Sequence, residues 1–190
     1  MPSRTTLILL GSLLTVLLLS PTSSLAGQLH DVIPGKLCHR EQFVTVDPFD
    51  TEEFREMVRV AITFWNDNAG RRLLRYEPTL FSMKKRYWVT IETASVGDLD
   101  DREWGTARMY WDKVPNPECI SGATIKIEPN IDTYDKKLLV IIHELGHILG
   151  LDHSEVKGTI MYFRITKSTK FILGTDTKEE LKKLYPRRRK

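Results

Sequence analysis

The chain has 190 residues, of which 41% are hydrophobic and 28% are charged, as expected of a globular protein that buries a core of its own. Its 28 lysines and arginines and its 25 aspartates and glutamates are interspersed along the sequence and leave a net charge of only +3. This balance argues against a nucleic-acid-binding protein.

The N-terminal segment has the features of a secretory signal peptide. Arg4 is followed by an apolar run over 7–19 and by the small-residue sequence SLA at 24–26. The run contains polar interruptions and is shorter than the roughly 18 to 20 apolar residues that a bilayer span needs, so an uncleaved anchor is the weaker alternative. We therefore expect a signal peptide over 1–26 and a secreted, extracellular protein with no stable membrane span after cleavage.

The remaining residues have the length of one domain. We expect a lead-in segment over 27–49 and a folded domain over 50–190. The chain has two cysteines, Cys38 and Cys119. In an oxidising compartment they are expected to form a disulfide, whereas two free thiols would suit a cytosolic protein.

Hydrophobic periodicity predicts the elements of the domain. Apolar residues recur at three- and four-residue steps over 50–68, which indicates an amphipathic helix that packs on a sheet. Short runs rich in β-branched and aromatic residues follow, and some of them alternate with polar residues. The predicted strands are 73–76, 87–92, 106–111 and 123–128.

Two further helices are predicted in the C-terminal half. One begins near Asp132 or Thr133, either of which can cap it, and is apolar on all sides over 138–142, as in a helix that passes through the core. The other begins at Thr177, where Glu180 completes a capping box, continues through Leu181 and Leu184, and stops at Pro186. The order of elements predicts a compact α+β domain.

Three of the chain's five histidines lie in the stretch HELGHILGLDH, at positions 143, 147 and 153. Positions four apart share one face of a helix, so His143 and His147 direct their imidazoles to the same place. Glu144 directly follows the first histidine and completes the His-Glu-x-x-His pattern. In that pattern the histidines hold zinc and the glutamate is the general base.

A third ligand requires the helix to end before His153. In a continued helix, His153 would be rotated by about 240° from His147 and displaced by about 9 Å, too far to share one centre. Gly150 stands where a left-handed residue would end the helix, a conformation that glycine adopts without steric cost. Three neutral imidazoles then converge on one cation, and three nitrogen ligands with one open position favour zinc.

The ordinary alternative is that these histidines are hydrogen-bonded core residues. Burying three imidazoles and a carboxylate without a shared partner would be costly, which favours the metal site. We therefore predict His143, His147 and His153 as ligands of one zinc ion and Glu144 as the catalytic residue.

The same stretch resembles the HExxHxxGxxH signature of the metzincin zinc endopeptidases, and with Ser154 it resembles the matrixin branch, which includes the matrix metalloproteinases. The sequences GATIKI at 122–127 and GTIMY at 158–162 and the stretch 175–185 are also similar to that family. The resemblance implies a metzincin-like, compact α+β zinc protease domain over 50–190, with a twisted mixed sheet, an active-site helix, a Met-turn and a C-terminal helix.

The resemblance also implies supporting roles for single residues. Met161 would lie in the turn beneath the metal and support the site without coordination, although methionine is also a common core residue. Tyr162 and Phe163 would border the pocket for the residue after the scissile bond, although they could equally be ordinary core aromatics. The family commonly has proline where this chain has Phe163. The family's cysteine-switch motif is absent from this sequence.

The implied reaction is hydrolysis of peptide bonds. Zinc lowers the pKa of bound water from about 15.7 to about 7, and Glu144 would accept the proton and deliver it to the leaving amine. The implied partner is a polypeptide in extended form, for which the strand predicted at 106–111 offers an edge.

Two questions stay open at this level. Asp98, Asp100 and Asp101 offer carboxylates suited to calcium, but an acidic surface loop is the commoner explanation. The functional alternatives are a secreted metal-binding effector that acts by contact without turnover, and a narrow amidase for small molecules or peptidoglycan fragments. The sequence does not indicate the number of subunits.

Overall fold

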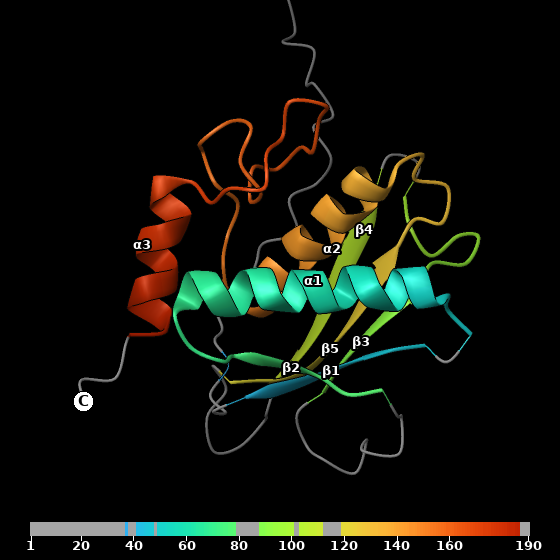
Figure 1. Ribbon diagram of the computed structural model, residues 1–190, viewed down its shortest axis with the longest axis horizontal. Coiled ribbons are helices and arrows are strands. Elements are labelled where there is room, and N and C mark those ends of the chain that lie inside the picture. Colours follow the sequence, from blue (N-terminus) through green and yellow to red (C-terminus); the bar gives the residue numbers. More distant parts are fainter. Residues whose placement is uncertain are drawn as a thin grey trace, which may run out of the picture.

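The computed structural model describes residue 37 and residues 41–47, 49–78, 88–100, 103–111 and 119–186 (Figure 1). These residues form five strands and three helices. The strands are β1 (Gln42–Val46), β2 (Leu74–Tyr76), β3 (Trp88–Thr93), β4 (Gly105–Trp111) and β5 (Ile120–Ile127). The helices are α1 (Glu52–Ala69), α2 (Tyr134–Ile148) and α3 (Thr175–Leu184).

The strands form one mixed sheet in the order β2-β1-β3-β5-β4. Strands β2, β1, β3 and β5 pair in parallel, and β4 runs antiparallel to β5 at one edge. Helices α1 and α2 pack on each other, and α2 also contacts β4 and β5 (Figure 1). The predicted α+β class with a mixed sheet is confirmed, and β4 is the edge strand next to α2.

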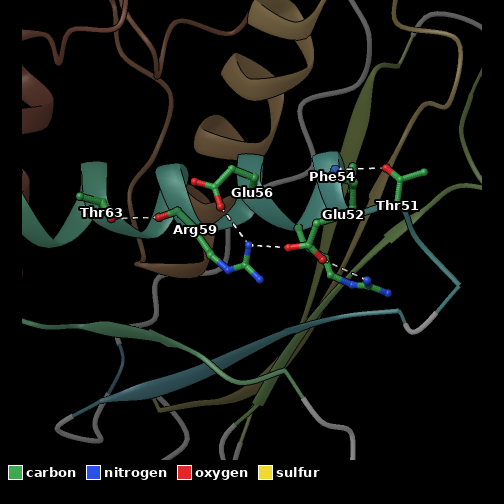
Figure 2. Close-up of polar contacts among 7 residues, drawn as sticks. Thr51, Glu52, Phe54, Glu56, Arg59 and Thr63 are labelled. Carbon is green, nitrogen blue, oxygen red and sulfur yellow. Dashed lines mark hydrogen bonds and ion pairs between the residues drawn. The ribbon is translucent and has the colours of Figure 1, made fainter.

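Helix α1 begins with a side-chain cap. The hydroxyl oxygen of Thr51 accepts a hydrogen bond from the backbone N–H of Phe54 at 3.2 Å (Figure 2). On the outer face, Arg59 Nη1 contacts Glu52 Oε1 at 2.8 Å and Glu56 Oε2 at 2.9 Å. This solvated face leaves the opposite, apolar face for the core, as the periodicity of the sequence predicts.

A tryptophan joins the two long helices. Trp65 on α1 is fully buried, and its indole N–H donates to the carbonyl oxygen of Ile142 on α2 at 2.8 Å. This bond gives the buried indole N–H the partner that it needs. It also fixes α1 against the turn of α2 that precedes the first histidine.

All four predicted strands are present, with ends shifted by a few residues. The prediction missed β1, which lies inside the expected lead-in segment and between β2 and β3 in the sheet. Its sequence QFVTV shows no regular alternation, because four of its five residues are buried. The boundary expected between the segments 27–49 and 50–190 stays a prediction.

Both C-terminal helices form. Thr133 caps α2, since its hydroxyl oxygen accepts from Lys136 N at 3.3 Å. The expected start of the last helix at Thr177 is wrong, because α3 begins two residues earlier, after Gly174. Thr177 is buried inside the helix, so its side chain is not a cap.

Several expectations fall on parts of the chain outside the described residues. The segment 1–26 is among them, and so is Cys38, so the signal peptide and the disulfide with Cys119 stay predictions. In the part of the chain that the structure describes, no helix combines the length and the apolar character needed to cross a membrane.

Candidate metal centre

Helix α2 places His143 and His147 one turn apart on the same side, as their spacing predicts. Their Nε2 atoms are 3.1 Å apart, and their ring centroids are 4.7 Å apart at an interplanar angle of 86°. Both rings are buried because this part of α2 lies within the core. Two imidazole edges therefore meet at one point in the interior.

Backbone carbonyls fix the orientation of both rings. His143 Nδ1 lies 2.7 Å from the carbonyl oxygen of Ile160, and His147 Nδ1 lies 2.9 Å from that of Leu151. A carbonyl oxygen only accepts hydrogen bonds, so each Nδ1 donates and each Nε2 of the neutral ring carries a lone pair. Two lone-pair atoms at 3.1 Å repel each other unless a cation binds them both.

A proton does not supply that cation at neutral pH. Burial, with a further contribution from His147, lowers the pKa of His143 to about 3. Burial and then His153 lower the pKa of His147 to about 4. Both rings therefore stay neutral, which is the form that binds a metal ion.

The end of α2 turns the chain back toward these rings. Gly150 has φ 81°, its N–H donates to the carbonyl of His147 at 2.8 Å, and Leu151 N–H donates to that of Gly146 at 3.1 Å. These two bonds form a Schellman motif, which requires a left-handed residue at position 150. The turn also directs the Leu151 carbonyl at His147. The same turn therefore ends the helix and orients the imidazole ring of His147.

His153 completes the cluster after this turn. Its ring centroid is 5.3 Å from that of His143 and 4.7 Å from that of His147. Each of the three residues offers one ligand atom, and these atoms all lie within 4.8 Å of one another. The structure therefore brings together the three histidines that the sequence predicts as ligands.

Met161 is fully buried, and its side chain lies against Gly146 of α2. The neighbouring Ile160 supplies the carbonyl to His143, and the Met161 carbonyl accepts from Ser154 N at 2.7 Å. A Cβ at Gly146 would collide with the Met161 sulfur and would lie 2.8 Å from Trp65 Cζ2. Glycine at 146 therefore allows the turn that carries Met161 to approach α2 closely.

Asp176, at the start of α3, secures the segment after His153. Its carboxylate accepts from the Ser154 hydroxyl at 2.8 Å, from Glu155 N at 3.0 Å and from Thr177 N at 2.7 Å. Burial alone would raise the pKa of Asp176, but these hydrogen bonds together lower it. Sequence reasoning missed this residue, for which the only signal was an acidic side chain in the first turn of a helix.

Tyr185, directly after α3, ties that helix to the end of α2. Its hydroxyl donates to the carbonyl oxygen of Leu149 at 2.9 Å and accepts from Leu37 N at 3.0 Å. Burial raises the pKa of Tyr185 to about 12, so the hydroxyl stays protonated and able to donate. No sequence pattern pointed to this residue.

Glu144 lies beside the cluster on α2. It is only 7% exposed, and burial, with a further contribution from Glu103, raises its pKa to about 8. A Cβ at Gly105 on β4 would lie 3.1 Å from Glu144 Cγ, so the glycine lets the edge strand lie against this side chain. A bound cation nearby would lower this pKa, because it stabilises the carboxylate.

The donor set fits zinc. Three neutral imidazole nitrogens are the protein ligands of one common type of catalytic zinc site, in which a fourth position stays open. The carbonyl partners of His143 and His147 are the outer contacts that commonly orient such ligands. Among the described residues, no other group of three histidines, cysteines or acids is arranged to hold a metal ion.

The calcium expectation is not supported. Asp98 is already engaged, because one carboxylate oxygen pairs with Lys126 Nζ at 2.8 Å and the other accepts from Ser95 N at 2.7 Å. Asp100 joins no metal-binding group among the described residues, and Asp101 lies outside them.

The two aromatic residues after Met161 lie together on the surface side of the turn. The ring centroids of Tyr162 and Phe163 are 4.6 Å apart, and Phe163 is 50% exposed. Their role as a pocket border stays a prediction.

One comparison with known proteins agrees with this geometry. A family model described as matrixin matches residues 92–186, which include β4, β5, α2, the three histidines and α3. A search of curated proteins found no match to the chain.

Proposed function

Because the chain belongs to the matrixin family, we propose that it is a secreted, zinc-dependent endopeptidase that hydrolyses peptide bonds in protein substrates. The observation that carries the proposal is the contact between the Nε2 atoms of His143 and His147 at 3.1 Å, with both Nδ1 atoms bound to carbonyls. This arrangement leaves two lone pairs facing each other in the interior, and a zinc ion held by these residues and His153 removes the conflict.

Glu144 is the general base in this proposal. Bound zinc would supply Lewis acidity, which lowers the pKa of water and polarises the carbonyl of the substrate. A carboxylate oxygen of Glu144 accepts the proton of the attacking water and then donates it to the leaving amine. The burial of Glu144 supports this role, because it excludes bulk water from the proton transfer.

The substrate is an extended polypeptide that adds to the edge of β4. Among the described strands β4 pairs only with β5, and its first residue, Gly105, lies close to Glu144. An extended peptide along that edge would form main-chain hydrogen bonds and would bring a peptide bond near the carboxylate. A polypeptide fits this edge better than a small amide does.

Cleavage of denatured casein tests the proposal. We expect wild-type protein to contain one zinc ion per chain and to cleave casein, and a zinc chelator to abolish cleavage. Glu144→Ala should keep its zinc but lose activity by about 10²-fold or more, the upper range of the contribution of a general base being about 10⁴-fold. The matched control Glu179→Ala changes an exposed carboxylate on α3 and should retain activity.

Other outcomes would favour the alternatives. Equal casein cleavage by wild type and Glu144→Ala would contradict the mechanism. Zinc binding without cleavage of any peptide in a diverse library would favour the metal-binding effector, and hydrolysis of small amides alone would favour the narrow amidase. The buried carboxylate beside the histidines argues for turnover, because a protein that acts by contact alone has no need of a base.

Secretion is part of the proposal and has its own test. It rests on the apolar run over 7–19 and the small residues at 24–26. Expression in a secreting host should release a protein whose N-terminus is residue 27, with Cys38 and Cys119 joined. A product that starts at residue 1 and stays inside the cell would contradict it.

A further inference from the structure

The segment 155–172, which follows the histidines, carries a surface that the metal centre does not use. Exposed cationic side chains dominate it, and Glu155 is the only acidic residue of the segment. Large apolar side chains are exposed among the cations, with Phe171 at 41% and Ile172 at 50%. We call these exposed residues of the segment the basic–apolar face, and they are Lys157, Arg164, Lys167, Lys170, Phe171 and Ile172.

Hydrogen bonds hold residues 158–160 and residues 170–172 of this segment side by side. Lys170 N donates to the carbonyl of Gly158 at 2.9 Å, and Ile160 N donates to that of Ile172 at 3.0 Å. The turn at 166–169 is closed at both ends, by Thr169 N to Thr166 O at 3.0 Å and by Thr166 N to Thr169 Oγ1 at 2.9 Å. These bonds fix the backbone on which Lys157, Lys170 and Ile172 border each other, and Lys167 lies inside the closed turn.

The positive charge of this face is not cancelled by its surroundings. Within the described ranges, none of its four cationic side chains takes part in an ion pair. Asp132 is an acid that interacts with this face, since its pKa is lowered mainly by Lys136 and to a smaller extent by Lys167. Asp132 already pairs with Lys136 Nζ at 2.6 Å, so the negative charge of Asp132 is largely neutralised by Lys136.

We propose that the basic–apolar face docks this protein on the surface of an anionic lipid bilayer. The four cations lie at the level of the lipid phosphates, and Phe171 and Ile172 enter the boundary between headgroups and acyl chains. A sulfated polysaccharide would use the cations alone and would leave both apolar side chains in water. Exposed apolar residues among uncompensated cations therefore favour lipid over other polyanions.

Docking in this way would hold the metal centre near the membrane. Phe163, two residues after the buried Met161, precedes Arg164 of the face directly, and the Arg164 guanidinium lies 5.9 Å from the centroid of its ring. Proteins at the membrane surface would then meet the cluster more often than proteins in solution. The docking itself uses neither zinc nor Glu144, so it can be tested independently of the proposed hydrolysis.

Sedimentation with lipid vesicles tests the proposal. We expect the purified protein to bind vesicles that contain phosphatidylserine, to bind pure phosphatidylcholine much more weakly, and to be released by salt. Each basic side chain near the surface contributes about fivefold in affinity. The double variant Lys167→Gln, Lys170→Gln should therefore bind roughly 25-fold more weakly, and Phe171→Ser with Ile172→Ser should weaken binding at every salt concentration.

Matched controls distinguish binding through the basic–apolar face from non-specific electrostatic binding. Lys182→Gln with Lys183→Gln removes two exposed cations from α3, and Val96→Ser removes a fully exposed apolar side chain from another loop. Both controls should bind like wild type. Equal loss in the α3 control, no effect of the serine double variant, or binding to heparin in the absence of vesicle binding would each overturn the proposal. Thermal unfolding checks that every variant is folded.

Discussion

At the scale of single residues, the centre depends on side chains whose charge state is set by burial. Burial keeps His143 and His147 neutral, and it favours the protonated form of Glu144. The same physical cause thus prepares two ligands for a cation and makes the neighbouring carboxylate costly without one. In the metal-free protein, ionisation of Glu144 should therefore lower the free energy of unfolding.

Glu144 gives a prediction for the metal-free protein. A carboxyl group whose pKa rises from 4.5 to about 8 on folding contributes stability below pH 4.5, and this contribution is lost as the pH rises through about 8. Glu144→Gln removes this loss, so with a chelator present it should be more stable than wild type at neutral pH by about 1 to 3 kcal/mol. Denaturant unfolding at several pH values measures the difference.

Zinc supplies the control for this prediction. A cation beside Glu144 stabilises the carboxylate, so the advantage of the glutamine variant should shrink when zinc is restored. If the stability of wild type and that of Glu144→Gln depend on pH in the same way without metal, ionisation of Glu144 does not destabilise the metal-free protein.

At the scale of elements, α2 was predictable because its signals are local. A threonine cap, an apolar run and a glycine stop follow one another in the sequence, and the histidine spacing depends only on helix geometry. Strand β1 was missed because its burial on both faces comes from elements that lie far away in the sequence. The start of α3 was misplaced because Thr177 is buried in the fold, which its local capping pattern does not reveal.

The link between α3 and the segment after His153 gives a prediction at this scale. The Asp176 carboxylate accepts hydrogen bonds from the Ser154 hydroxyl and from Glu155 N, directly after His153. Asp176→Asn keeps the shape but weakens these bonds, so His153 should be positioned less precisely. We expect zinc affinity to fall roughly tenfold or more, the range for residues that orient metal ligands, in competition with a chromogenic chelator.

Glu179→Gln is the matched control, since it neutralises an exposed acid on the same helix. Its zinc affinity should equal that of wild type. A normal affinity in Asp176→Asn would mean that the turn holding Met161 positions His153 without help from α3.

At the scale of the whole molecule, distant parts of the chain meet at the end of α2. Leu149 is bound by Tyr185, which lies 36 residues further along, and the same hydroxyl binds Leu37, which lies 148 residues before it. Such contacts leave no periodic trace in the sequence, which is why the clustering of the three histidines could be predicted and the hydrogen bonds of Tyr185 could not. Tyr185 thus connects Leu37, α3 and the end of α2.

Tyr185→Phe tests this connection. The change keeps the ring in the core but leaves the Leu149 carbonyl and the Leu37 N–H without their partner, and an unsatisfied buried polar group costs about 1 to 3 kcal/mol. We expect a loss of that size in the free energy of unfolding, measured with denaturant. Tyr134→Phe is the control, because Tyr134 is 41% exposed and should change stability little. Since the lost bond lies next to the turn at Gly150, zinc should also dissociate faster from Tyr185→Phe than from the control, and equal rates would show that the turn holds its shape without the tyrosine.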